Sequence, residues 1–162
     1  MSAPAPSPAA VPATGVAVVP GPDWSLTFVQ RADGPRAGHW LLPGAQAAEG
    51  EPPEQAARRG ADEAGLHVGA LAPIAIYEVR GSDGGSDYHE WLHVYRSLHP
   101  CPMDPDAHAE GAEVEQVHPR DLLPHPTDMR ILCDAELADY DPVLIRRLLS
   151  ADGVLIRRVD GD

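Results

Sequence analysis

The sequence predicts a mixed α/β fold, in which helices cover both faces of a mixed central sheet to form an α/β/α sandwich. Two observations carry this prediction. Strand-like and helical segments follow the order strand, strand, strand, helix, strand, strand, strand, helix. The chain has 162 residues, of which 43% are hydrophobic, and this suffices for one domain with its own core. We assign residues 14–162 to that domain and residues 1–13, rich in proline and alanine, to an unstructured leader.

The charge of the chain excludes several classes of function. The formal net charge is −13, which disfavours a general electrostatic attraction to nucleic acid or to an anionic membrane. All 12 basic residues are arginine, so lysine Schiff-base chemistry is excluded. The sequence contains neither a long apolar run nor a signal peptide, and we expect a cytoplasmic protein. It leaves a homodimer open.

Three strands and a loop are expected before the first helix. Residues 16–19 form a β-branched segment that stops at a Pro-Gly-Pro break, and residues 25–30 alternate as its hairpin partner would. A loop over residues 31–38 then leads into a strand over residues 39–42. The loop carries Arg31 and Arg36, which are either exposed loop arginines or contacts for a phosphate.

The central helix is predicted from Glu54 to Gly65, after a pair of prolines that suit a first turn. One arc of this helix contains only alanine and glycine, so it can lie close against a sheet, while the other arc is charged. The acidic side chains are oxygen ligands of the kind that Mg²⁺ takes, or simply a solvated face. They are Glu51, Glu54, Asp62 and Glu63.

Residues 44–66 resemble the Nudix box, the loop–helix signature of the Nudix hydrolases, whose pattern is G-x5-E-x7-R-E-U-x-E-E-x-G-U with U aliphatic. Counted back from Gly65, Asp62 and Glu63 match the acidic pair and Arg58 matches the arginine. Glu51 resembles the loop glutamate of the family. The preceding residues, HWLLPG, are similar to the W-x-L-P-G entry of the box.

The chain also departs from this pattern. Ala45 replaces a second glycine, and the span from Glu51 to the arginine is one residue short. Arg59 stands where the family has a metal-binding glutamate; in the alternative register, Arg59 is the matching arginine and Gly60 replaces that glutamate. Neither register restores the carboxylate. The helical spacing allows Arg59 to pair with both Asp62 and Glu63.

Two long strands are expected after the box, over residues 71–80 and 88–98, joined by a glycine-rich hairpin loop. In the second strand, alternation places His89, Trp91 and His93 on one face. This face is either one wall of a ligand pocket, as the resemblance implies, or an amphipathic cover of the core.

The remaining elements are a short acidic strand over residues 113–117 and two helices. The resemblance makes Glu113 and Glu115 candidates for an additional carboxylate near a metal, and the alternative is an exposed strand edge. We expect Thr127 or Asp128 to cap a helix over residues 129–137. A second helix, over residues 143–150, follows Asp141 and a proline that suits its first position.

The resemblance implies a metal-dependent hydrolase that cleaves the diphosphate linkage of a nucleoside diphosphate-linked small molecule. Mg²⁺ or Mn²⁺ would bind Glu51, Asp62 and Glu63, Arg58 would orient the loop through Glu51, and Arg59 and Gly44 would lie against the ligand. The candidate catalytic carboxylates are Glu51, Glu63, Glu113 and Glu115, and the candidate substrate-binding residues are Arg31, Arg36, Gly44, Arg59, His89, Trp91 and His93.

Two alternatives stay open from the sequence. Because Arg59 replaces a metal ligand, the protein can be a Nudix-fold binding module for a phosphorylated or nucleotide-like ligand, with impaired hydrolysis or different chemistry in the same pocket. The other alternative is a purely structural, partner-binding domain.

Overall fold

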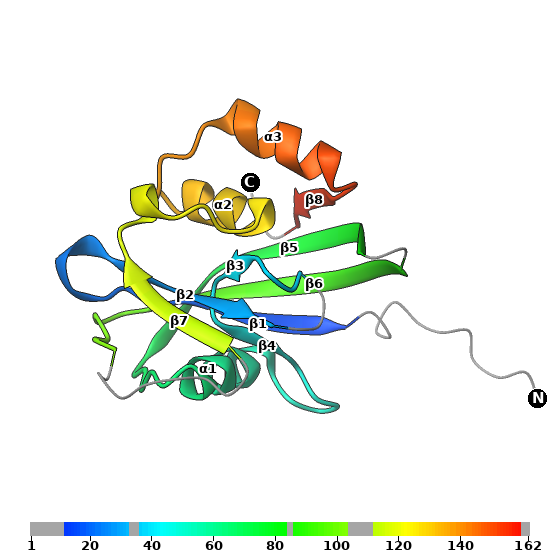
Figure 1. Cartoon of the computed structure of the whole chain (residues 1–162). Coiled ribbons are helices and arrows are strands. Elements are labelled where there is room, and N and C mark those ends of the chain that lie inside the picture. Colours follow the sequence, from blue (N-terminus) through cyan, green and yellow to red (C-terminus); the bar gives the residue numbers. More distant parts are fainter. Residues whose placement is uncertain (1–11, 33–35, 84–85, 104–111, 160–162) are drawn as a thin grey trace, which may run out of the picture.

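Two sheets form the framework of the computed structural model, which describes residues 12–32, 36–83, 86–103 and 112–159 (Figure 1). The larger sheet has five strands in the order β4-β1-β6-β5-β8, and the smaller has the order β3-β2-β7. Among the described strands only β1 and β6 pair in parallel, so the larger sheet is mixed, as the sequence predicts. The strands are β1 (Ala13–Val18), β2 (Leu26–Arg31), β3 (Trp40–Leu41), β4 (Gly44–Gln46), β5 (Leu71–Asp83), β6 (Ser86–Ser97), β7 (Ala112–Val117) and β8 (Leu155–Arg158).

Helices cover both faces of the larger sheet, which confirms the sandwich (Figure 1). Helix α1 (Pro53–Glu63) packs on one face, and α2 (Pro126–Asp134) and α3 (Pro142–Ala151) pack on the other. Two short 3-10 turns, η2 (Pro22–Trp24) and η3 (Pro119–Asp121), complete the elements. No helix in the described ranges is long and apolar enough to cross a membrane.

The small residues of α1 bring it into backbone contact with the sheet, as the sequence predicts. Ala56, Ala57 and Ala61 are completely buried. A Cβ atom on Gly60 would collide with the backbone of Gly44, and one on Gly15 would collide with the backbone of the helix. This close approach fixes the position of α1 against β1 and β4.

Several sequence-based element assignments need correction. The predicted hairpin of residues 16–19 and 25–30 is reduced to one isolated antiparallel bridge, between Pro20 and Leu26. Beyond it β2 pairs with β3 and β7 in the smaller sheet, because the turn at Pro22–Trp24 redirects the chain. The chain also re-enters the larger sheet after Pro43, as β4. His125, not Thr127 or Asp128, caps α2: its Nδ1 accepts a hydrogen bond from the backbone N–H of Thr127 at 3.2 Å.

The predicted cap of helix α3 is confirmed, whereas strand β8 was not predicted from the sequence. The Asp141 carboxylate accepts a hydrogen bond from the N–H of Val143 at 2.9 Å. The string Leu-Ile-Arg-Arg is helical at residues 144–147 and forms an edge strand at residues 155–158. Tertiary pairing with β5 therefore decides the conformation of the second copy.

Candidate functional site

The loop between β4 and α1 folds back on itself around Glu51. Its Oε1 accepts a hydrogen bond from the N–H of Ala48 at 3.0 Å, and its own N–H donates to the Ala48 carbonyl at 2.9 Å. Gly50, just before it, has a φ of 78°, which glycine adopts without strain. The turn aims the Glu51 carboxylate at the charged arc of α1.

Arg59 on α1 holds this loop. Its Nη2 and Nε donate to the two oxygens of Glu51 at 2.9 Å and 3.2 Å, and Nη2 also donates to the carbonyl of Gln46 at 2.8 Å. Its Nη1 lies 3.4 Å from Glu63. The expected pair with Glu63 is confirmed, whereas the expected pair with Asp62 is absent from this described part of the chain. One guanidinium thus binds the loop, the helix and the end of β4.

The loop-orienting role that the resemblance implied for Arg58 belongs to Arg59. Arg58 does not contact Glu51; its Nη1 donates to the carbonyls of Val68 and Gly69, at 3.0 Å and 2.7 Å. It therefore anchors the chain that follows the helix, and Arg59 orients the loop through Glu51. This correction gives Arg59 the loop-orienting role that the alternative register would assign to it.

The paired charges also fix the ionisation of the loop. Hydrogen bonds from Arg59, and then from the Ala48 N–H, lower the pKa of Glu51 below its ordinary value. The same pair raises the pKa of Arg59. Both groups therefore stay charged and bound to each other across the physiological range.

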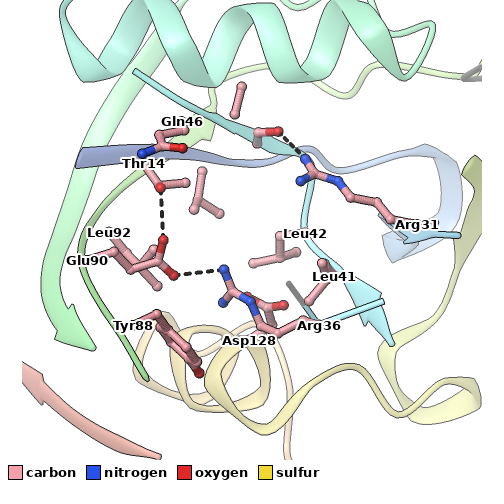
Figure 2. Close-up of a pocket in the computed structure, with 13 residues that line it drawn as sticks. Thr14, Arg31, Arg36, Leu41, Leu42, Gln46, Tyr88, Glu90, Leu92 and Asp128 are labelled. Carbon is pink, nitrogen blue, oxygen red and sulfur yellow. Dashed lines mark hydrogen bonds and ion pairs between the residues drawn. The ribbon is translucent and has the colours of Figure 1, made fainter. Parts of the chain in front are cut away.

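A pocket with a volume of about 160 Å³ lies beside β4, on the face of the larger sheet that α2 covers (Figure 2). Residues from β1, β2, β3, β4 and β6 line it, together with Arg36, Leu42 and the first turn of α2. Its polar side chains are Thr14, Arg31, Arg36, Gln46, Tyr88, Glu90 and Asp128. We call this cavity the first pocket.

Two arginines reach into the first pocket: Arg31, the last residue of β2, and Arg36, in the loop between β2 and β3 (Figure 2). Arg36 Nη2 donates to Glu90 Oε1 at 2.8 Å, and the Arg36 guanidinium carbon lies 6.0 Å from the centroid of the Tyr88 ring. Thr14 donates to the other oxygen of Glu90 at 3.1 Å. Arg31 Nη2 donates to the carbonyl of Gly44 at 2.8 Å. Three of the predicted substrate-binding residues, Arg31, Arg36 and Gly44, therefore line one cavity.

Asp128, on the first turn of α2, is the buried acceptor of the first pocket. It is 4% exposed, and its Oδ2 atom has no hydrogen-bond partner. Burial raises the pKa of Asp128 to about 7, although Arg36 and the hydrogen bond from the Leu42 N–H act in the opposite direction. An unpaired buried acceptor is costly unless a ligand supplies a donor.

A model of the NUDIX domain matches residues 10–134, which is most of the chain. The chain belongs to the Nudix family. Residues 44–66, which resemble the Nudix box, lie within the matched range, and we call them the box below. No curated protein matches this chain.

Solved Nudix structures have the same fold. The NUDIX domain of Shewanella oneidensis NrtR, complexed with ADP ribose, is similar at 20% identity with a TM-score of 0.61, over 80% of this chain and 91% of that one. The MutT protein from Bacillus halodurans is similar at 17% identity with a TM-score of 0.64, over 94% and 100%. The MutT Nudix hydrolase from Burkholderia pseudomallei is similar at 23% identity with a TM-score of 0.55, over 75% and 95%.

Nudix hydrolases generally use divalent metals, but the box of this protein does not present a matching set of ligands. Both oxygens of Glu51 are bound by Arg59, and the side chains of Asp62 and Glu63 are exposed. Among the residues that the structure describes, no three His, Cys, Asp or Glu side chains lie close enough together to hold a metal ion. The carboxylates of Glu51, Asp62 and Glu63, in this arrangement, do not fit Mg²⁺ or Mn²⁺ as ligands.

The two candidate carboxylates of β7 do not take part in the contacts of the box. Glu113 and Glu115 are exposed on the smaller sheet, opposite Gln30 and Phe28 of β2. Neither forms an ion pair or a hydrogen bond with the described residues of the box. The geometry thus favours an exposed strand edge, the alternative reading of these residues.

The prediction that His89, Trp91 and His93 form a pocket wall is wrong for the first pocket. The wall of that pocket comes from Tyr88, Glu90 and Leu92, which alternate with His89, Trp91 and His93 along β6 and therefore face the other side. On that side the Nε2 atom of His89 lies 2.7 Å from Glu78 Oε2. Hydrogen bonds from Arg157, and then His89, lower the pKa of Glu78 to about 2.

Sequence reasoning missed Glu90 and Asp128 as pocket residues. The alternation of β6 carried a signal for Glu90, because it shares a face with apolar Leu92 and Val94. Asp128 was noticed as a helix cap, and only the packing of α2 into one core with Leu92 and Val94 of β6 reveals its place in a cavity.

Proposed function

We propose that this Nudix protein binds a nucleoside diphosphate-linked small molecule in the first pocket, and that its box is held by Arg59 in a state that does not need a metal ion for binding. The observation that carries the proposal is the pairing of Arg59 with Glu51, which places a guanidinium among the acidic groups of the box. The protein would then act mainly as a ligand-binding Nudix domain.

The arginines of the first pocket suit the diphosphate. Arg31 and Arg36 are the cations of this cavity, and a guanidinium can form two hydrogen bonds to phosphate oxygens. The unpaired Oδ2 of Asp128 suits an N–H or O–H donor on the nucleoside part. The NrtR NUDIX domain, which has the same fold, is described in complex with ADP ribose. This supports ADP ribose as the first ligand to test.

Calorimetric titration of the intact chain with ADP ribose, in the presence of EDTA, tests this proposal. We expect binding without metal, weakened about 10- to 100-fold in Arg36→Gln, because the lost contact is charge-assisted. The matched control is Arg146→Gln, on the exposed side of α3, which should leave the affinity unchanged. Binding that requires Mg²⁺ or Mn²⁺, or no loss in Arg36→Gln, would contradict the proposal.

One observation favours metal-dependent cleavage of the diphosphate as a second candidate. Glu51 and Glu63 contact the same guanidinium, so their oxygens already surround a single positive charge. If Arg59 moved away, these carboxylates and neighbouring Asp62 would be the residues to hold Mg²⁺ or Mn²⁺. Chromatography of nucleoside diphosphate-linked compounds after incubation with the chain and Mn²⁺ separates the candidates, because only the hydrolase releases monophosphate products.

A further inference from the structure

Strand β8 forms one edge of the larger sheet, beside β5 (Figure 1). It pairs with β5 in antiparallel register, with Leu155 opposite Arg80 and Arg157 opposite Glu78. In the part of the chain that the structure describes, no strand pairs with the other edge of β8. An edge strand presents a row of backbone N–H and C=O groups with which another chain can pair.

The register with β5 shows which backbone groups of β8 face outward. The N–H of Val159 donates to the carbonyl of Ile76 at 2.9 Å, so these two residues are a hydrogen-bonded pair. Such pairs alternate along an antiparallel ladder, and Arg157 and Leu155 therefore also bond to β5. Ile156, which lies between them, directs its N–H and C=O away from β5. The backbone of this residue is therefore accessible to an added strand.

The opposite edge of the same sheet, β4, is covered by side chains. The carbonyl of Gly44 accepts a hydrogen bond from Arg31, and the carbonyl of Gln46 accepts one from Arg59, both at 2.8 Å. Among the described residues, no side chain bonds to the backbone of Ile156 in this way. Of the two edges, only β8 keeps outward backbone groups ready for a partner.

The side chains beside this edge carry an excess of positive charge. Arg157 and Arg80 both bind the carboxylate of Glu78: the Nε atom of Arg157 lies 2.6 Å from one oxygen, and the Nη2 atom of Arg80 lies 3.3 Å from the other. The two arginine side chains are 67% and 61% exposed. Two guanidinium groups thus share one carboxylate, although the chain as a whole has a net charge of −13. An acidic partner is attracted to this edge and repelled elsewhere.

An exposed leucine and a groove accompany these charges. Residues of β5 and β8 line the groove, which has a volume of about 560 Å³. Leu155 is 72% exposed and shares a face with Arg157, because side chains alternate along a strand. Helix α1 packs mainly on β1 and β4, so it does not cover this part of the sheet. A strand added to β8 would meet a cation and, two residues away on the same face, an apolar side chain.

The same charges disfavour a second copy of this chain as the partner. If two copies of β8 paired, the arginines at positions 157 and 158 of both copies would gather in one short segment, and like charges close together destabilise a sheet. A strand with acidic side chains would meet the opposite charge instead.

We propose that β8 binds an extended acidic segment of another protein. The segment adds a strand to the larger sheet through hydrogen bonds to the backbone of Ile156, and it places an acidic side chain opposite Arg157 and an apolar one opposite Leu155. This partner-binding edge is separate from the first pocket, which lies on the face of the sheet that α2 covers.

Calorimetric titration of the intact chain with synthetic peptides, in a buffer of low ionic strength, tests the proposal. The probe is an octapeptide of the repeat Thr-Glu-Thr-Leu, in which glutamate and leucine alternate along one face. One matched peptide has lysine in place of glutamate, and another has the acidic sequence with N-methylated backbone amides. We expect the acidic probe to bind at least about 10-fold more tightly than either, because the lysine peptide lacks the charge-assisted contact and the methylated peptide lacks backbone donors.

A variant then locates the peptide at β8. Arg157→Gln should weaken binding of the acidic probe about 10-fold, because it removes the cation opposite the glutamate. The matched control is Arg146→Gln, on the exposed side of α3, which should leave the affinity unchanged. Thermal melting of both variants shows that they are folded, and the three peptides test the proposal on the wild-type chain as well.

Three results would overturn the proposal. The first is equal binding of the acidic and lysine peptides, and the second is an affinity that Arg157→Gln does not change. The third is tight binding of the N-methylated peptide, which would show that side-chain charges alone attract it. Sedimentation of the chain with and without the acidic probe examines a second copy as the occupant. We expect the probe to leave the oligomeric state unchanged; a dimer that the probe dissociates would place a second copy on β8 and exclude the acidic partner.

Discussion

The box helix and the first pocket both bring arginines and carboxylates together, but they satisfy these charges differently. At the box, Arg59 directs its N–H donors to Glu51, Glu63 and a carbonyl of β4, so these charged groups are bound to one another. In the first pocket, Asp128 keeps a buried oxygen without a partner beside Arg36 and Glu90. A ligand that binds at the box must first break hydrogen bonds that the protein already makes. A ligand that binds in the first pocket can instead donate a hydrogen bond to an unpaired acceptor, so we expect the more favourable free energy of binding there.

The largest effect is expected where the box helix contacts β4. Gly60→Val places a branched side chain against the backbone of Gly44, and this overpacking should lower the free energy of unfolding by about 3 kcal/mol or more. Urea denaturation measures the loss. Gly69→Ala, where nothing lies within 4 Å of the added carbon, is the control and should change little. A small loss in Gly60→Val would place the helix farther from β4.

The next largest effect is a pH dependence of the free energy of unfolding, which comes from Asp128 in the first pocket. The folded-state pKa of Asp128 is raised from 3.8 to about 7, so the folded chain binds an extra proton between these values. The stability of the wild-type chain relative to Asp128→Asn should therefore fall as the pH rises from about 4 through 7, by about 2 kcal/mol or more. Denaturant unfolding at a series of pH values measures this difference.

Ligand binding should remove part of that pH dependence. A ligand that donates a hydrogen bond to Asp128 favours its ionised form, so saturation with ADP ribose should lower the pKa of this residue and release protons near pH 6. Titration in buffers with different heats of ionisation detects the released protons. Proton uptake in place of release would mean that Asp128 donates to the ligand.

The smallest effect is expected from Arg58, the box arginine that does not contact the loop. Arg58→Gln removes hydrogen bonds to the carbonyls of Val68 and Gly69 and should cost about 1 kcal/mol of stability, with no change in ligand affinity. Urea denaturation and calorimetry measure the two quantities. The control is exposed Arg147→Gln on α3. A large loss of affinity in Arg58→Gln would return the loop-orienting role to this residue.

The sequence predicted the features that depend on neighbouring residues. The small-residue face of α1 and the cap at Asp141 were predicted because helical spacing and local hydrogen bonds determine them. The partner of β2, the edge strand β8 and the place of Asp128 in a cavity depend on pairing between distant segments. The local cap at Asp141 predicted the helical copy of Leu-Ile-Arg-Arg, but no local pattern predicted the second copy as a strand. The two registers of the box left open whether Arg58 or Arg59 reaches Glu51.

We propose that the Arg59 guanidinium takes the position of a cation in the box. Calorimetric titration with Mn²⁺ of the wild-type chain and of Arg59→Glu tests it most directly, with Arg58→Gln as the matched control. We predict weak Mn²⁺ binding in the wild-type and control chains and binding at least about 10-fold tighter in Arg59→Glu, because the variant replaces the bound cation with a further carboxylate ligand. Tight Mn²⁺ binding by the wild-type chain, unchanged in Arg59→Glu, would contradict the account.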